Sequence, residues 1–366
     1  MVENSQKPID KSSQQNLGEA IIKTPVRSKE KLVKRFFSSL LIFWAKHETA
    51  ISLGFLAIAI IFPILFNQQY FLSIGVNVML YATLSVSLNL ITGFMGITSL
   101  SHAAFLGIGA YTAAILSTRL GANFPITFLA GAAMAGLFGL LLGLPSLRIK
   151  GRFLAIVTLG FGEIARMVEL NWMSLTRGPQ GISGIPKVSL FGWIMKSPAQ
   201  KYYVILAILV LVVLAVAAIM NSRVGRAISA IRDDEVAAAA MGINVFGYKL
   251  MVFSISAAFA GLAGAFYAHY MSFIDPNAFS FAQSILILSV TIFGGMASIA
   301  GSVFGALTLL VLPELLRFLI DYRLIIYGFV LVIMMVFQPN GLLGGFNLKH
   351  IKQQTMFRES QERSES

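Results

Sequence analysis

Long apolar runs follow one another along most of this chain, and no other feature restricts its fold as strongly. A membrane-spanning helix needs about 20 consecutive, mostly apolar residues. Charged residues make up only 12% of the sequence, about half of the roughly 25% that is usual in soluble domains. Ten segments are candidate spans: 50–66, 72–93, 100–118, 124–144, 153–173, 201–220, 246–270, 283–296, 302–320 and 323–337.

These segments predict an all-α fold, a polytopic transmembrane helical bundle of about ten spans. Eight to ten are compatible with the sequence, because the runs at 283–296 and 323–337 are short enough to be tilted, broken or re-entrant. We expect one membrane domain over residues 48–345. Residues 1–47 predict a cytoplasmic, largely disordered tail, and residues 346–366 predict a second cytoplasmic tail.

The positions of Lys and Arg set the expected orientation, because these residues accumulate on the cytoplasmic side of a membrane. With the N-terminus inside, twenty of the 28 are cytoplasmic: nine before residue 48, Arg148, Lys150, Arg152, four from Arg223 to Lys249, and four after residue 345. Both termini are therefore predicted to be cytoplasmic. The loop 174–200, with adjoining Lys201, carries four of the other eight and is the main exception. Membrane topology thus accounts for the net charge of +12, and no nucleic acid partner is expected.

Several kinds of chemistry lack the residues that they need. The chain has no cysteine, so disulfides and thiolate metal sites are excluded. Its four histidines, at 47, 102, 269 and 350, are too scattered to predict a metal site. The phosphate-binding pattern GxxxxGK[ST] is absent, so a dependence on ATP would have to come from a partner. A membrane enzyme has little support, because no polar catalytic cluster is visible.

Small residues recur at one-turn spacing in three of the segments, which favours close helix packing in lipid. They are Gly107, Gly109 and Ala113; Gly131, Ala135 and Gly139; and Ala257, Gly261 and Gly264. Packing within one subunit is the simpler interpretation, and a pore-lining or dimer face is the alternative. Two similar Gly-rich breaks, at 93–101 and 294–302, also predict broken helices and leave an internal repeat open.

Charged and polar groups inside apolar segments are candidates for a solute pathway. Glu163, Arg166 and Glu169 share one helix face, where they form either part of a pathway or an ion-pair ladder near the headgroups. Glu314, Arg317 and Asp321 form a similar group. At the first break, Ser99, Ser101 and His102 offer hydroxyls and an imidazole to a polar solute, although a lone histidine in a packed helix is often satisfied locally.

The segment 222–245 predicts an amphipathic cytoplasmic helix between two spans. Ile228, Ile231, Val236 and Ala239 fall near one stripe, and Gly242 is placed to end the helix. Such a stripe needs a surface to lie on. Three adjacent acids, Asp233, Asp234 and Glu235, disfavour anionic lipid and favour a groove on a partner protein.

Seven motifs in order resemble the LivM-type permease subunits of bacterial ABC importers for branched-chain and other hydrophobic amino acids. They start at Leu88 (LNLITGFMG), Ser99 (SLSHAAF), Gly160 (GFGEIAR), Gly178 (GPQGISGIP), Arg226 (RAISAIRDDE), Phe293 (FGGM) and Gln338 (QPNGLLG). They cover roughly residues 70–345. Two features depart from the family pattern: the EAA-type signature is only loosely present at 235–242, and Arg177 stands where a smaller residue is expected.

The resemblance implies a transport subunit rather than an enzyme, in the bacterial inner membrane, with no cofactor of its own. Its implied partners are a LivH-type permease, two cytoplasmic ATPases that bind ATP and Mg, a periplasmic solute-binding protein and membrane lipid. The implied ATPase-coupling residues are Arg226, Arg232, Asp233, Asp234, Glu235, Ala238, Ala239 and Gly242. The candidate translocation residues are Asn89, Gly93, Gly96, Ser99, Ser101, His102, Glu163, Arg166, Gly294 and Gly295. Import of urea or a short amide, and ion-coupled transport or channel activity, remain the alternatives.

Overall fold

The computed structural model describes residues 48–315, except positions 67, 150, 191, 192 and 196, and also residue 328. The predicted tails 1–47 and 346–366 lie outside the described residues, as does the predicted last span 323–337 apart from position 328. Residues Leu56–Phe346 belong to one compact unit, and its described residues form the body discussed below.

Helices dominate the described chain. Twelve α-helices are accompanied by one π-helix and two 3-10 turns: α3 (Glu48–Leu65), α4 (Gln69–Asn89), η1 (Leu90–Phe94, π), α5 (His102–Leu120), α6 (Phe124–Ser146), α7 (Arg152–Asn171), α8 (Met173–Thr176), η2 (Gly178–Gln180), α9 (Pro198–Asn221), α10 (Arg223–Asp233), α11 (Glu235–Ala240), α12 (Val245–Met271), η3 (Pro276–Phe279), α13 (Phe281–Gly294) and α14 (Ile299–Leu315). Two short antiparallel pairs were not predicted. Strand β1 (Ile182–Ser183) pairs with β4 (Phe273–Ile274), and β2 (Ser189–Leu190) pairs with β3 (Trp193–Ile194).

Five of the described helices are long and apolar enough to cross a membrane: α4 continued by η1, α5, α6, α9 and α12. A sixth candidate is the pair α13 and α14, which is bent by 118° at a short break. The predicted span at 153–173 is helical as α7, but it is not among these candidates because it carries too much charge. The structure therefore supports a helical membrane bundle, and the count of ten spans and the sidedness of the termini stay predictions.

Helices α5, α6 and α12 pack together along the small residues that the sequence singled out. A methyl group at Gly109 would overlap the backbone of Gly261, and one at Gly261 would lie 2.5 Å from the Cβ of Ala135. Gly131 lies against the backbone of Gly109 in the same way. Packing inside this chain therefore accounts for these residues, as the simpler interpretation held. Only glycine allows two helix backbones to approach so closely.

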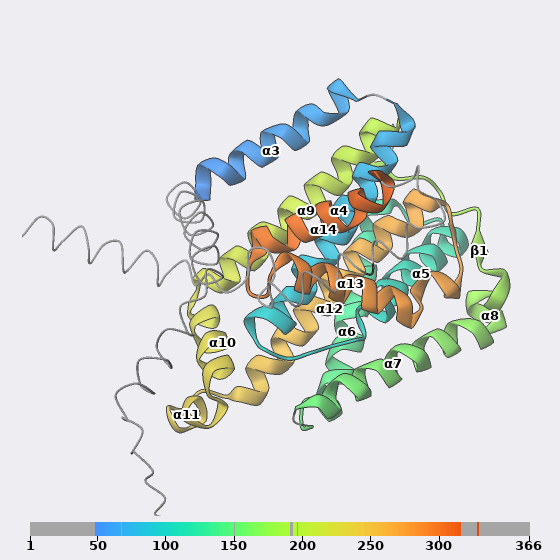
Figure 1. Cartoon of the computed structure of the whole chain (residues 1–366). Coiled ribbons are helices and arrows are strands. Elements are labelled where there is room, and N and C mark those ends of the chain that lie inside the picture. Colours follow the sequence, from blue (N-terminus) through green and yellow to red (C-terminus); the bar gives the residue numbers. More distant parts are fainter. Residues whose placement is uncertain are drawn as a thin grey trace, which may run out of the picture. The chain divides into compact units, whose positions relative to one another are not determined.

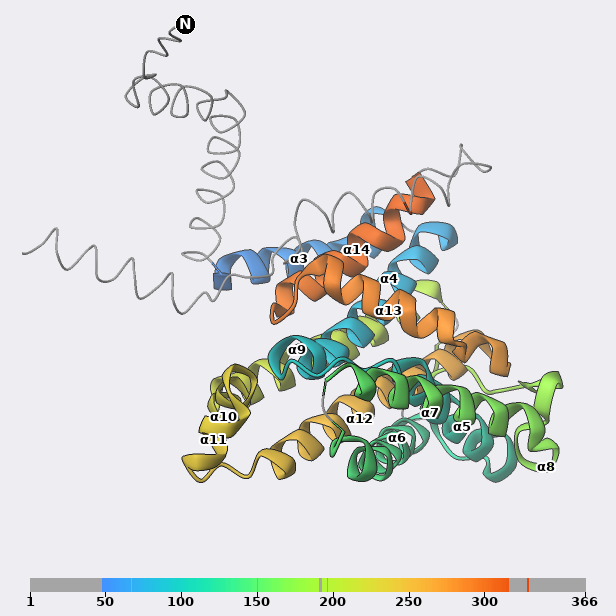
Figure 2. The ribbon, with the colours of Figure 1, turned by 60° about the horizontal axis from the view of Figure 1, so that its bottom comes forward.

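Helix α4 packs against α9, α12, α13 and α14, beside the α5–α6–α12 group. Figures 1 and 2 both place α10 and α11 at one end of this body and α8 at the other. The loop 174–200 is therefore on the opposite side from α10 and α11, as the predicted topology requires. His269, at the end of α12, holds this loop: its Nδ1–H donates to the carbonyl oxygen of Pro186 at 2.7 Å, and Thr127 Oγ1 lies 2.8 Å from its Nε2.

Candidate functional site

The two Gly-rich breaks predicted from the sequence are both present. After α4, the chain makes the π-helix η1 and then runs without regular structure from residue 95 until α5 begins at His102. Between α13 and α14 the chain turns within four residues, from Gly295 to Ser298. Such interruptions at membrane depth need other partners for their backbone groups. The partners of these breaks therefore define the candidate site.

Asn89, at the end of α4, joins the first break to the second. Its amide nitrogen donates to the carbonyl oxygens of Ser298 (2.9 Å) and Gly295 (3.3 Å) and to the hydroxyl of Ser302 (2.7 Å). Its amide oxygen accepts from the backbone N–H of Ala297 at 2.8 Å. The side chain is fully buried. Asn89, which we predicted to line a pathway, thus acts in this structure as a bracket between two breaks.

The glycines predicted for the pathway lie around this bracket. A Cβ at Gly93 would collide with the Asn89 side chain and the Ala297 amide. Gly294 packs against the backbone of Gly301, and Gly295 follows as the residue that ends α13. These three positions are thus part of the contact between the breaks. Their role toward a solute stays a prediction.

The polar groups of the first break bind one another and neighbouring helices. The hydroxyls of Ser99 and Ser101 lie 3.0 Å apart. The backbone N–H of Leu100 donates to Thr158 of α7 at 3.0 Å, and that of Ala103 donates to Ser284 of α13 at 3.2 Å. The break is therefore tied to two helices that lie far from it in sequence, and neither partner was predicted.

His102 begins α5 and is fully buried. Its Nε2 lies 3.1 Å from the hydroxyl of Ser87 and 3.4 Å from that of Ser256. Its Nδ1 has no hydrogen-bond partner in the described structure. One ring nitrogen is thus satisfied locally, which is the ordinary interpretation, and contact of His102 with a solute stays a prediction.

The segment 222–245 forms two helices, and the prediction of one continuous amphipathic helix was wrong. Asp234 is extended (φ −156°, ψ 110°) and separates α10 from α11. Its carboxylate accepts from the backbone N–H groups of Val236 (2.8 Å) and Ala237 (3.0 Å). Asp234 therefore caps a new helix, because an aspartate satisfies the first N–H groups of a helix well. The predicted end at Gly242 is confirmed, since the N–H of Ile243 bonds back to the carbonyl of Ala238 at 3.1 Å.

The predicted apolar stripe is divided between the two helices. Ile228 and Ile231 of α10 are buried in the chain's own body, with 0% and 1% exposure. On α11, by contrast, Val236 is 76% exposed and Ala239 is also exposed, while Met241, just beyond the helix, is 82% exposed. Of the other predicted coupling residues, Ala238 is buried, and Arg226, Arg232, Asp233, Asp234, Glu235 and Gly242 are exposed. The apolar surface open to a partner is thus Val236, Ala239 and Met241, which we call the α11 face.

Arg232 connects this segment to the first break. A Cβ at Gly96 would lie 3.4 Å from the Cγ of Arg232, so the side-chain stem of Arg232 rests on the irregular backbone after η1. The segment is also fastened to α12 by an ion pair between Glu235 and Lys249. Arg232 therefore brings α10 into contact with the first break, which Asn89 joins to the second.

The charged triplet of α7 does not form a continuous ladder. Arg166 pairs with Glu163 at 2.9 Å, and both side chains are partly exposed. Glu169 is buried and forms no ion pair within the described structure. Of the second charged group, Glu314 accepts a hydrogen bond from the hydroxyl of Tyr70, while Arg317 and Asp321 lie outside the described residues.

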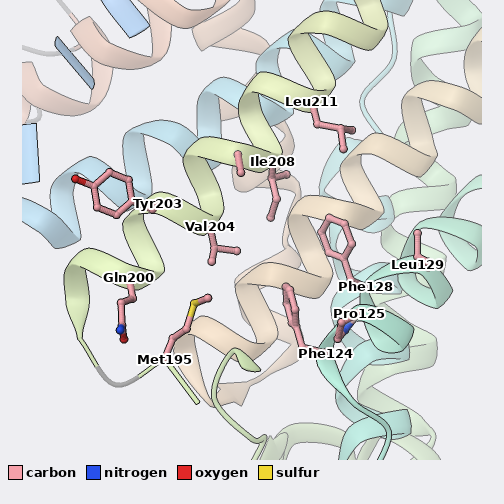
Figure 3. Close-up of a pocket in the computed structure, with 11 residues that line it drawn as sticks. Phe124, Pro125, Phe128, Leu129, Met195, Gln200, Tyr203, Val204, Ile208 and Leu211 are labelled. Carbon is pink, nitrogen blue, oxygen red and sulfur yellow. The ribbon is translucent and has the colours of Figure 1, made fainter. Parts of the chain in front are cut away.

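A shallow apolar groove of about 600 Å³ opens between α6 and α9, near the ends that face the 174–200 loop. Figure 3 shows side chains of both helices around it, together with Met195. Beside it, Leu129 is 67% exposed and Leu211 is 50% exposed. Nothing in its lining offers specific polar recognition, so we assign the groove no solute.

Comparisons with known proteins agree with the resemblance of the motifs. A family model described as "Branched-chain amino acid transport system / permease component" matches residues 70–338. The high-affinity branched-chain amino acid transport system permease protein LivM of Escherichia coli K12 is 36% identical over 311 residues, which cover 79% of this chain and 73% of that protein. LivM of Salmonella typhimurium is also 36% identical, with 80% and 74% covered. LivH of the same organism is 24% identical, with 76% and 96% covered. No solved structure matches.

Proposed function

Because this chain belongs to the family of branched-chain amino acid transport permeases, a family of multi-pass membrane proteins, we propose that it imports branched-chain or other hydrophobic amino acids across a bacterial inner membrane. It does so as one subunit of an ABC importer. ATP and Mg bind to two cytoplasmic ATPase subunits, and a periplasmic binding protein delivers the solute. The relatives include proteins named LivM and LivH, which supports a second, LivH-type permease as its partner in the membrane.

The α11 face carries this proposal. Val236 and Ala239 of the short, capped helix α11, and Met241 just beyond it, expose apolar side chains. Both views place α11 at the end of the body away from α8. A soluble surface rarely leaves such residues together without a partner. A groove on an ATPase subunit accepts an apolar helix face of this kind. The adjacent acids stay exposed at the rim, where they set the orientation of docking.

The same segment mechanically connects the ATPases to the two breaks in the membrane helices. Movement of the ATPases displaces α11, and α10 moves with it because α10 immediately precedes α11 in the chain. Arg232 then shifts the irregular backbone at Gly96, and Asn89 passes the change to the turn between α13 and α14. A permease that alternates between inward and outward access needs such a linked pair of breaks.

The test is assembly and transport of the full complex carrying Val236→Asp and Ala239→Asp. We expect at least a tenfold weaker association with the ATPases, about 1.4 kcal/mol, and a parallel loss of ATP-driven uptake into proteoliposomes. Ser229→Asp is the matched control, since it places the same charge on an exposed residue of α10. Ala238 is avoided because its side chain is buried.

Unchanged association and uptake in the α11 variants would overturn the docking proposal. An equal loss with Ser229→Asp would show that charge on the segment, and not the α11 face, is responsible. Uptake by the purified chain alone, driven by an ion gradient without ATPases, would instead establish the secondary-transporter alternative. Uptake of urea in place of amino acids by the complete complex would correct the substrate class.

A further inference from the structure

Glu169 and Tyr111 are buried side chains near Gly107 and Phe279, and each carries an oxygen atom without a hydrogen-bond partner. Within the described residues, four buried side-chain atoms lack a hydrogen-bond partner: Thr92 Oγ1, His102 Nδ1, Tyr111 Oη and Glu169 Oε2. Glu169 is 6% exposed and Tyr111 is 4% exposed. A buried polar group without a partner costs free energy, and a carboxylate costs more than a hydroxyl. Such a pair calls for an explanation.

Helices α5 and α7 and the turn η3 hold the Glu169 carboxyl in place. Its Oε1 lies 2.7 Å from the position that a Cβ at Gly107 would take, so the absence of a side chain there makes room for it. The Phe279 ring lies 3.0 Å from the same position. Tyr111 follows Gly107 by one helical turn, and its ring meets that of Phe279 edge to face at 5.9 Å between centroids. The carboxyl thus lies between α5 and η3, beside two aromatic rings.

Among the described residues, no basic side chain forms an ion pair with Glu169. Arg166, the nearest basic residue along α7, is paired with Glu163, although its charge also acts on Glu169. The other ion pair of the described chain joins Lys249 to Glu235. Asp275 caps η3 by accepting from the N–H of Asn277 at 2.8 Å and adds a second negative charge to the same region. The described residues contain no cluster of metal-ligating side chains. In the part of the chain that the structure describes, the site therefore combines two acids and a phenol without an ion pair to Glu169.

An organic ammonium group fits these features. It carries one positive charge and three N–H donors, which match the carboxylate oxygen and the phenolic oxygen. Aromatic rings attract a cation and also accept an apolar side chain. The site lies near the end of α7 beside η3, on the side of the 174–200 loop, where solute arrives if α11 faces the cytoplasm.

We propose that Glu169 and Tyr111 bind the α-ammonium group of the amino acid as it enters the permease from the outer side. This inference rests on the proposed import function. In the present structure helices and η3 enclose the site, so solute reaches it when η3 moves away from α5. Phe279 then separates the ammonium site from solvent after solute has passed.

The first test compares Glu169→Gln with Glu169→Asp in the complete complex, reconstituted with L-leucine-loaded binding protein. Glu169→Gln removes the carboxylate, whereas Glu169→Asp keeps it on a shorter side chain at the same buried position. We expect at least a tenfold fall in leucine transported per ATP hydrolysed for Glu169→Gln and a clearly smaller fall for Glu169→Asp. Tyr111→Phe is expected to lower the same ratio several-fold, whereas Tyr81→Phe, whose hydroxyl is bonded to Gln283, is the matched tyrosine control.

Equal transport per ATP in wild type and Glu169→Gln would overturn the inference, as would equal losses in the two Glu169 variants. The proposed function fails separately, if the wild-type complex shows no ATP-driven uptake at all.

A second measurement tests directly whether solute covers the Glu169 carboxyl. A hydrophobic carbodiimide labels buried carboxyl groups, and peptide mass spectrometry locates the label. We expect leucine-loaded binding protein to protect Glu169 from labelling in the complex, and unloaded binding protein to give no protection. Equal labelling under both conditions would overturn the inference even if Glu169→Gln is poorly folded. Protection by Na⁺ or K⁺ alone, without leucine, would assign the site to an inorganic cation and overturn it as well.

Discussion

The α5–α6–α12 group and the α10–α11 segment use small and apolar residues in opposite ways. In the first, glycines and alanines bring three helix backbones into contact, so that these faces of α5, α6 and α12 are buried against one another. In the second, α10 buries Ile228 and Ile231 while α11 exposes Val236 and Met241. The first region buries its small residues within the chain, whereas the second leaves apolar side chains exposed, where we propose that a partner binds. Residue type alone does not distinguish the two regions, because the neighbouring helices decide whether a small or apolar side chain is buried or exposed.

The largest expected effect is on the glycine contact. Gly109→Ala places a methyl group on the backbone of Gly261, which cannot move aside. We expect a loss of about 3 kcal/mol in the free energy of unfolding, or failure to assemble. Gly160→Ala is the control, because Gly160 lies in α7 with nothing within 4 Å of its Cβ position. Thermal unfolding of the purified protein measures both, and similar Tm values would contradict the close packing.

The second-largest effect is expected at Asn89, whose side chain joins the two breaks. Asn89→Leu keeps most of the volume and removes all four hydrogen bonds, leaving the partly buried N–H of Ala297 without its acceptor. We expect a loss of about 2 kcal/mol and faster amide exchange at residues 295–298. Hydrogen exchange followed by mass spectrometry measures this. Ser302→Ala removes a single one of these bonds and is expected to cost less; an equal effect would show that Asn89 is not the main link.

A pair of mild substitutions sharpens the contrast between α10 and α11. Ile228→Val removes one buried methylene, and we expect a loss of about 1 kcal/mol in stability with no change in affinity for the ATPases. Val236→Thr is expected to do the reverse, because its side chain is exposed in the isolated chain. Tm and ATPase affinity, measured on both variants, form the test. The comparison breaks down if both variants change the same quantity.

The smallest effect is expected at the ion pair between Glu235 and Lys249. Glu235 is largely exposed and Lys249 is mostly buried. Such pairs contribute up to about 1 kcal/mol and are weakened by salt. We therefore expect Glu235→Gln to lower the Tm slightly at low ionic strength and not at high ionic strength. A Tm difference that is independent of salt would point to packing rather than charge.

The sequence predicted those features that depend on local pattern. Small residues at one-turn spacing predicted close helix packing, and the contact of Gly109 with Gly261 is an instance of it. The Gly-rich breaks and the end of α11 at Gly242 followed from the same kind of reasoning. Asp234 was within reach, since an aspartate before an alanine run is a good helix cap. We interpreted it instead as one of three adjacent acids on a single helix that disfavour anionic lipid.

The long-range partners could not be read from the sequence. Asn89 and Ala297, Leu100 and Thr158, and Tyr111 and Glu169 meet only once the helices have packed. The sequence pattern of each segment predicts its own helix or break and gives no indication of the distant residue that it contacts. Glu169 was noticed as part of a triplet, but nothing in its spacing distinguished it from Glu163. Burial by α5 and η3 makes the difference, and burial is a property of the fold.

The bracket at Asn89 also has a consequence for biogenesis. Its amide and the Ala297 backbone are 208 positions apart, so at roughly 5–20 residues per second the ribosome needs about 10 to 40 s to make the second after the first. During that interval α4 resides in the bilayer with an amide whose final partners do not yet exist. The early half of the chain must therefore wait in a provisional arrangement, and an insertase or chaperone that shelters α4 would act in that window.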